Sequence, residues 1–261
     1  MELSLAGRHA LVCGGSAGIG RASALALAGL GAEVTVLARS PDRLADAVSD
    51  LRQAGAQAAR SVVADLADRP ALGRAIDTLL AAHGPVHVLV NNSGGPPSGP
   101  LVDATEADFL AALGPHLFAA HLLVQRCLPG MVAADFGRII NVISTSVREP
   151  IDGLGVSNTT RAAVAAWAKT LSRELPPGVT INNVLPGFTD TDRLVGLSAA
   201  ISERTGQPVD AVRAAWVEAV PEGRIGRPDE LGAVVAFLAS PAAAYVRGTS
   251  LAVDGGRMRG L

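Results

Sequence analysis

Short apolar segments alternate with helical segments along the chain, and this order constrains the fold more than any other feature. The first apolar segment, 9–13, ends at a run of glycines, and a segment of helical composition follows at 21–30. Because roughly ten or more helical residues separate successive strands, the strands are expected to run parallel, with right-handed crossovers that place helices on both faces of the sheet. The sequence therefore predicts one doubly wound α/β domain. Its expected strands lie at 9–13, 33–38, 61–64, 86–90, 138–143, 179–184 and 250–253.

Two loops that follow expected strands are rich in proline and glycine. One has the sequence SGGPPSGP at 93–100, and the other contains Pro186 and Gly187. In open parallel sheets, ligands bind outside the carboxyl ends of the strands, at the point where the strand order reverses. We therefore expect both loops to border the functional site.

Composition excludes several classes of function. Hydrophobic residues make up 49% of the 261 residues, and Lys+Arg 22 against Asp+Glu 24 leaves a formal charge of −2. With 3% aromatic residues, the chain has neither the basic patch nor the stacking surface of a nucleic-acid binder. The two cysteines, Cys13 and Cys127, are too few for a disulfide framework, and no metal site is predicted from the histidine spacing. Because neither a signal-peptide pattern nor an apolar run of membrane-spanning length is found, we expect a soluble, cytoplasmic protein that binds no membrane.

A glycine-rich segment, GGSAGIG at 14–20, joins the first expected strand to the first helix with the spacing G-x-x-x-G-x-G. Glycines let the backbone approach a pyrophosphate closely, and the helix N-terminus offers unpaired N–H groups and a partial positive charge. The position between a strand and a helix favours dinucleotide binding over the alternative of a tight turn without a ligand. The expected contacts are Gly14, Ser16, Gly18, Ile19 and Gly20.

The end of the second expected strand indicates which dinucleotide binds. Folds that take NAD usually carry an acidic residue there for the ribose 2′-hydroxyl, but this chain has Ala38 followed by Arg39. Because a guanidinium suits a 2′-phosphate, we expect NADP(H) rather than NAD(H). The alternative is that Arg39 is a solvated surface residue, and Arg43 is expected to be a charge on the helix surface that can assist.

Six motifs resemble, in order, those of the short-chain dehydrogenase/reductase family, and the resemblance covers essentially the whole chain. It implies a single Rossmann-type domain over residues 1–261, a nicotinamide dinucleotide, and a homotetramer or homodimer. The motifs are CGGSAGIG at 13–20, Asp65-Leu66, NNSG at 91–94, GRIINVIS at 137–144, NNVLPG at 182–187 and VDGG at 253–256.

The resemblance also implies contacts with the adenosine half of the cofactor. Asp65, with Leu66 beside it, would touch the adenine amine, and Asn91 would support the central strand. The turn that contains Ser93 and Gly94 would lie near the adenosine ribose. Two structural alternatives stay open, because Asp65 also suits a helix N-terminal cap and Asn91 a residue that only holds strand ends together.

At the nicotinamide end, the resemblance implies contacts from Pro186, Gly187 and Thr191. The alternative for Thr191 is that it only caps the helix expected to start next to it. In the family, the segment that follows forms a mobile lid over the substrate, and we expect this lid at about 190–222. The stiff loop at 94–97 would form another wall of the substrate site.

The family's catalytic tetrad of Asn, Ser, Tyr and Lys is largely replaced in this chain. Ser144 matches the serine, but Ser157 stands at the tyrosine position and Arg161 at the lysine position. His116 stands at the asparagine position. The chain has one tyrosine and one lysine, and they lie too far apart in sequence to form the family's pair on one helix.

Each replacement has a chemical consequence. A serine hydroxyl lacks the acidity of a phenol, so Ser157 is a poor proton donor, while Arg161 stays cationic and suits ribose hydroxyls or an oxyanion. His116 is expected to titrate near neutrality and to act as acid, base or relay, and Gly114-Pro115 is expected to break or kink the helix and aim it inward. Three of the residues at the tetrad positions also have a structural alternative. His116 would only stand at a helix kink and take no part in the chemistry. Ser157 would cap a helix N-terminus, and the Ser144 hydroxyl would only form a hydrogen bond with the backbone.

The sequence thus predicts an NADP-linked oxidoreductase that acts on a carbonyl or alcohol of a small molecule. Ser144 would hold the substrate oxygen, His116 or a water would move the proton, and Arg161 would hold the ribose. The alternative is a dinucleotide-binding sensor or partner subunit without turnover. The alanine-rich segments 119–133 and 161–174 are expected to pack between subunits, or else against the sheet.

Overall fold

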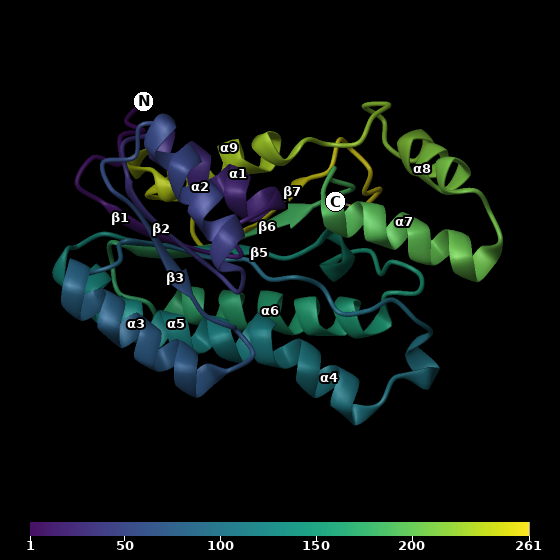
Figure 1. Cartoon of the computed structure of the whole chain (residues 1–261), viewed down its shortest axis with the longest axis horizontal. Coiled ribbons are helices and arrows are strands. Elements are labelled where there is room, and N and C mark those ends of the chain that lie inside the picture. The colour runs from purple at the N-terminus through teal and green to yellow at the C-terminus, as the bar shows by residue number, and fades with distance from the viewer. Residues whose placement is uncertain (261) are drawn as a thin grey trace.

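The computed structural model describes residues 1–260, which form one seven-stranded sheet flanked by helices (Figure 1). The strand order is β3-β2-β1-β4-β5-β6-β7, and every neighbouring pair is parallel. This is the predicted Rossmann-type α/β fold, and the expected strands agree with the observed ones to within about two residues. The strands are β1 His9–Cys13, β2 Glu33–Ala38, β3 Ala59–Val63, β4 Val88–Asn91, β5 Gly137–Val142, β6 Val179–Pro186 and β7 Ser250–Val253.

Helices cover both faces of the sheet, as a doubly wound fold requires. α1, α2 and α9 lie on one face, and α3, α5 and α6 lie on the other (Figure 1). One core cluster contains Val12 of β1 with Leu27 of α1 and Leu231 of α9, and the other contains Leu11 with Leu123 of α5. The helices are α1 Gly18–Gly29, α2 Pro41–Gln53, α3 Arg69–His83, α4 Glu106–Leu113, α5 Ala119–Ala133, α6 Gly155–Glu174, α7 Asp192–Thr205, α8 Val209–Glu218 and α9 Pro228–Ala239.

The central strands are buried on both sides, which explains why they appear in the sequence as continuous apolar runs. All five residues of β1 are buried. Successive side chains of a strand point to opposite faces, so Ala10 belongs to the cluster beside α1 while Leu11 and Cys13 belong to the cluster beside α5. Cys13 is a small buried core residue.

The strand order reverses between β1 and β4. The chain builds β2 and β3 on one side of β1 and then returns to lay β4 on the other side. At such a switch point the loops after the two strands diverge and leave room for a ligand. The glycine-rich turn after β1 and the proline-rich loop after β4 therefore border the same opening.

The expectation that Gly114 and Pro115 break the helix is wrong. Helix α4 continues into α5 through a single π-helical segment, Gly114–Phe118. Proline lacks an N–H and its ring clashes with the preceding turn, and a wider i→i+5 turn accommodates both effects without ending the helix. His116 lies in this wider segment and is buried, so the inward orientation that we expected is observed.

Helix 106–133 also bears on the expectation that the chain binds no membrane. It is the one helix within residues 1–260 that is long and apolar enough to cross a membrane. Its most apolar 18-residue stretch has a mean hydropathy of 1.4. Its α5 portion packs against α3 and against β5 in this fold. A core helix of a soluble domain meets the same criteria of length and composition.

Candidate cofactor and substrate site

The glycine-rich turn is shaped by close contacts that exclude side chains. Gly14 and Gly18 have φ angles of 60° and 52°, a region that favours glycine. A Cβ atom on Gly20 would lie 2.7 Å from the carbonyl carbon of Gly14 and 2.8 Å from Nδ2 of Asn92. Within the described residues, no side chain caps the N-terminus of α1 at Ala17. The first N–H groups of α1 are therefore open to an anion such as a pyrophosphate.

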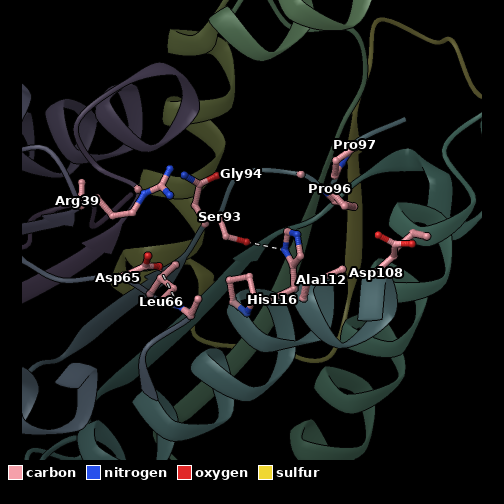
Figure 2. Close-up of a pocket in the computed structure, with 18 of the residues that line it drawn as sticks. Arg39, Asp65, Leu66, Ser93, Gly94, Pro96, Pro97, Asp108, Ala112 and His116 are labelled. Atoms are coloured by element: carbon pink, nitrogen blue, oxygen red, sulfur yellow. Dashed lines mark hydrogen bonds between the residues drawn. The ribbon is translucent and has the colours of Figure 1, made fainter. Parts of the chain in front are cut away.

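A cavity of about 1160 Å³ collects the residues that were expected to bind the adenosine half of a dinucleotide (Figure 2). The turn after β1, the end of β2, the segment after β3 and the loop after β4 line this cavity. Arg39 is exposed at its edge, beside Arg43. The residues predicted from sequence that line it are Gly14, Ser16, Arg39, Arg43, Asp65, Leu66, Ser93, Gly94 and His116.

Asp65 does not cap a helix. The N-cap of α3 is Asp68, whose side chain accepts from the backbone N–H of Ala71. Asp65 is exposed at the cavity, and its Oδ1 accepts from the N–H of Ala67 at 2.9 Å. Because Asp65 does not cap a helix, its second carboxylate oxygen, Oδ2, is available to a ligand.

Asn91 belongs to a ladder of asparagine side chains that crosses the sheet. Its Nδ2 donates to Oδ1 of Asn141 at 2.8 Å, and Asn141 Nδ2 donates to Oδ1 of Asn183 at 2.9 Å. Asn183 Nδ2 then donates to Oγ of Ser250 at 3.0 Å. The ladder ties β4, β5, β6 and β7 together, which agrees with the structural interpretation of Asn91. Sequence reasoning did not identify the other members, although each is a polar residue within an expected strand.

A second cavity, of about 830 Å³, adjoins the first and shares Gly14 and residues 92–95 with it. It collects residues from β5, α6 and the loop after β6 beside the start of α1. Thr191 caps α7, since its Oγ1 accepts from the N–H of Leu194 at 3.4 Å, and its Cγ2 lies 3.2 Å from where a Cβ on Gly18 would be. The residues predicted from sequence that line it are Gly18, Ile19, Ser144, Ser157, Arg161, Pro186, Gly187 and Thr191.

The two serines of this cavity differ in their surroundings. Ser144 follows β5 and is half-buried, and its Oγ accepts from the N–H of Ser146 at 3.0 Å. Ser157 is buried in the first turn of α6, whose N-cap is Leu154, so the alternative of an N-cap at Ser157 is wrong. The bond at Ser144 uses the oxygen as acceptor and leaves its hydroxyl hydrogen free to donate to a ligand.

Arg161 is held against the end of β5. Its Nη1 donates to the carbonyl oxygen of Ile143 at 2.8 Å and of Val142 at 3.3 Å. Burial and the charge of Arg193 lower the pKa of Arg161 to about 10, which still leaves a cation at neutral pH. The guanidinium is therefore a fixed positive charge one turn after Ser157.

His116 enters from the other side of the loop after β4. Its Nδ1 lies 2.5 Å from Oγ of Ser93, as the dashed line in Figure 2 marks. Burial, with smaller contributions from the charges of Arg161 and Arg193, lowers the pKa of His116 to about 3. The expectation that this histidine titrates near neutrality is therefore wrong, and its imidazole is neutral at pH 7.

Besides Arg21, which pairs with Asp50, two arginines that the sequence reasoning missed line the second cavity. They are Arg193, in the first turn of α7, and Arg257, shortly after β7. The signal for Arg193 was its place two residues after the expected contact Thr191, whereas Arg257 is far from the other site residues in sequence. Over residues 1–260, no group of three or more His, Cys, Asp or Glu side chains is placed to hold a metal ion.

A parallel sheet with a glycine-rich turn and an uncapped helix N-terminus at its switch point defines the class of Rossmann dinucleotide-binding proteins. Residues 14–257 match the family described as enoyl-(acyl carrier protein) reductase. The chain belongs to the short-chain dehydrogenase/reductase family and is an oxidoreductase of this type, whose members use NAD(P).

Individual relatives agree with this assignment. The 3-oxoacyl-(acyl-carrier-protein) reductase of Vibrio cholerae serotype O1 is 36% identical over 265 residues, which cover 97% of this chain and 98% of the relative. The crystal structure of L-sorbose reductase from Gluconobacter frateurii, complexed with NADPH and L-sorbose, has a TM-score of 0.93 at 27% identity and covers 100% of both chains. An NADP-bound 3-oxoacyl (acyl-carrier-protein) reductase from Agrobacterium tumefaciens C58 has a TM-score of 0.86 at 30% identity, with 97% and 95% coverage.

Proposed function

We propose that this chain is an NADP-linked oxidoreductase that interconverts a carbonyl and an alcohol on a small molecule with an altered catalytic tetrad. The observation that carries the proposal is that Ser144, Ser157 and Arg161 line one cavity beside the glycine-rich turn. The single tyrosine, Tyr245, is fully exposed, and the single lysine, Lys169, donates to a backbone carbonyl 3.0 Å away. Neither Tyr245 nor Lys169 lines the cavity that residues 1–260 form. This supports a reaction that proceeds without a tyrosine or a lysine.

The preference for NADP(H) over NAD(H) is part of this proposal. Arg39 and Arg43 line the first cavity beside the end of β2, where a 2′-phosphate would lie in a Rossmann fold. Ala38 ends β2, so no carboxylate stands there to accept from a 2′-hydroxyl. The relatives described with NADPH or NADP bound are consistent with this preference.

The substrate oxygen is proposed to lie between Ser144 and Arg161. Bound NADPH would supply the hydride for the carbonyl carbon. Ser144 would donate its free hydroxyl hydrogen to the carbonyl oxygen. Arg161 would stabilise the negative charge that develops on that oxygen, because it is a buried cation whose position is fixed by two backbone carbonyls.

The proton is proposed to come from solvent through His116 and Ser93. A neutral imidazole donates at one nitrogen and accepts at the other, so it passes a proton on without storing one. With a pKa of about 3, His116 cannot be a stored acid at pH 7. Because a positioned acid typically contributes about 10²–10⁴-fold, we expect slow turnover and a preference for substrates whose alkoxide or enolate is stabilised.

We also propose a single domain in which the segment at about 190–222 covers the substrate, and a homodimer or homotetramer in the cytoplasm. Helices α7 and α8 form this segment, and Phe188 stacks on Trp216 of α8 with ring centroids 5.0 Å apart. Exposed alanines on α6, Ala162 and Ala166, leave room for a neighbouring subunit to approach closely. The low aromatic content and near-neutral charge support a small-molecule substrate rather than a nucleic acid or a membrane.

A second candidate is a dinucleotide-binding sensor or partner subunit without turnover. It is favoured by one contrast: the glycine-rich turn is complete, but Ser157 stands at the tyrosine position of the second cavity, and His116, which lines the first cavity, is neutral. Such a protein would bind NADPH tightly and reduce nothing.

The experiment that separates the two is NADPH oxidation with a panel of ketones, quinones and activated carbonyls. We expect Ser144→Ala to lower kcat at least about 10-fold while NADPH affinity is retained, because the serine would contact the substrate oxygen and not the phosphates. Ser49→Ala, on the exposed surface of α2, is the matched control. Turnover unchanged in both S144A and H116A would contradict the assigned residues, and tight NADPH binding with no turnover would favour the sensor.

A further inference from the structure

Three guanidinium groups gather at the second cavity without a carboxylate partner. Arg161 donates to backbone carbonyls of residues 142 and 143, and Arg193 Nη2 donates to the carbonyl oxygen of Pro96 at 2.6 Å. Arg257 Nη1 lies 3.3 Å from Oγ1 of Thr145, and its guanidinium lies 4.7 Å from the ring centroid of Phe188. None of the salt bridges formed within residues 1–260 includes any of these three arginines.

The carboxylates that line the same cavity pair with other arginines. Asp190 pairs with Arg213 at 3.2 Å, and Asp229 pairs with Arg227 at 3.0 Å. Asp192 lies 3.7 Å from Arg43. The three carboxylates of the cavity thus pair with other arginines and not with Arg161, Arg193 or Arg257.

A nearby acid outside the cavity lining is occupied as well. Oε1 of Glu149 accepts from the backbone N–H of Arg259 at 2.7 Å and of Gly260 at 2.9 Å. These two bonds, more than the charge of Arg257, hold the pKa of Glu149 below its usual range. Glu149 therefore stays ionised and attracts Arg257 through space, but its hydrogen-bond acceptor is used by the backbone and it forms no ion pair with Arg257 among residues 1–260.

The charges of Arg161 and Arg193 shift the pKa values of groups near them. Arg193 lowers the pKa of Arg161, and both arginines lower the pKa of His116, which is the direction expected where positive charges lie close together. An anion placed between them would be attracted by each. A carboxylate suits arginine in particular, because its two oxygens match the planar guanidinium fork.

Arg193 and Arg257 are placed to bind one end of a substrate rather than the oxygen that reacts. Arg193 spans from α7 to the loop after β4, where its guanidinium lies 3.1–3.3 Å from the position of a Cβ on Gly95. Arg257 contacts Phe188 and Thr145, the residue that follows the proposed oxygen-binding Ser144 in sequence. Both line the cavity that also contains Ser144 and Arg161.

We propose that Arg193 and Arg257 bind a carboxylate of the substrate, so that the proposed oxidoreductase acts on oxo- or hydroxycarboxylic acids. This proposal rests on the proposed function for the identity of the reacting group, but it makes an independent statement about binding. The carboxylate anchors one end of the substrate while Ser144 binds the oxygen of the carbonyl or alcohol. Neutral ketones of the same shape lack this anchor.

The test is calorimetric titration of the protein saturated with NADP⁺, in which a ketone binds but cannot be reduced. The probes are 2-oxopentanoate, 4-oxopentanoate and 5-oxohexanoate, each beside its methyl ester. We expect at least one acid to bind at least about 10-fold more tightly than its ester, since a hydrogen bond to a charged group at a partly exposed site contributes on that order. Arg193→Met and Arg257→Met keep the apolar stem and should each reduce the preference to near parity.

Controls separate this site from the cofactor site and from folding. Arg173→Gln removes an exposed charge at the far end of α6 and should leave the acid preference unchanged, and thermal unfolding checks that each variant is folded. Equal binding of acids and esters, or binding of neither while NADP⁺ binds, would overturn the proposal and leave the proposed function standing. Weakened NADP⁺ binding in R193M with an unchanged acid preference would assign Arg193 to the cofactor instead.

If the protein binds no NADP⁺, the proposed function fails, and the same acids and esters are titrated into the protein alone. A preference for acids that both arginine variants abolish would still support the carboxylate site. Equal or absent binding would overturn it.

Discussion

Replacing Gly20 with alanine is the sharpest test of how the glycine-rich turn works. The new Cβ would lie 2.7 Å from the carbonyl carbon of Gly14 and 2.8 Å from Nδ2 of Asn92, whereas ordinary contact begins near 3.4 Å. The turn or α1 must therefore move by several tenths of an ångström. Overpacking of this kind costs about 1–3 kcal/mol of unfolding free energy. The displaced N–H groups also lose alignment with a phosphate, and each hydrogen bond to a charged group contributes about 1.5–3 kcal/mol.

We accordingly expect Gly20→Ala to lower the unfolding temperature and to weaken NADPH binding at least about 10-fold in a fluorescence titration. Gly29→Ala is the matched control at the other end of α1. Apart from its chain neighbours and the backbone of its own helix, no atom of residues 1–260 lies within 4 Å of its Cβ position. In the control, alanine should be neutral or stabilise the helix by up to about 1 kcal/mol. If G20A binds NADPH within about twofold of the wild type, the assignment of this turn to phosphate binding is refuted.

Three further predictions concern the site. The double variant S157Y/R161K restores a phenol and an amine at the family's positions, and kcat for a reduced ketone should rise about 10²–10⁴-fold, with no rise arguing against the missing acid as the limit. Arg39→Ala should weaken NADPH binding roughly 10-fold and leave NADH binding unchanged, so equal losses would contradict the 2′-phosphate contact. His116 has a pKa of about 3 when folded and near 6.5 when unfolded, so acid protonates the unfolded chain first. The unfolding free energy should therefore fall as pH drops below about 6.5, by on the order of 2 kcal/mol at pH 5, and urea titrations should show a smaller fall in His116→Asn.

Local patterns were sufficient to predict most elements of the fold. Ser40 and Pro41 predicted the start of α2, and the side chain of Ser40 accepts from the N–H of Arg43 as an N-cap. The apolar run at 250–253 predicted β7 with its observed ends. Such features depend on neighbours along the chain, so a sequence reveals them directly.

Errors arose where the outcome depends on packing. Gly114 and Pro115 were expected to break or kink a helix, and the helix does not break but continues through a π-helical segment between α4 and α5. Ser157 was open to interpretation as an N-cap, but α6 starts at Gly155 and buries it within the first turn. In both cases the preferred local structure is marginal, and contacts with the sheet and neighbouring helices select the result.

The order of residues along the chain determined the parallel α/β sheet, the glycine-rich turn and the residue types at the replaced tetrad positions, because these follow from periodicity and spacing over short distances. Only the tertiary structure decided that His116 is neutral, and that Arg161 of α6, Arg193 of α7 and Arg257 near the last strand line one cavity. The physical reason is that a pKa and a cluster of charges depend on burial and on distances in space. Segments remote in sequence set both quantities only when the chain is folded.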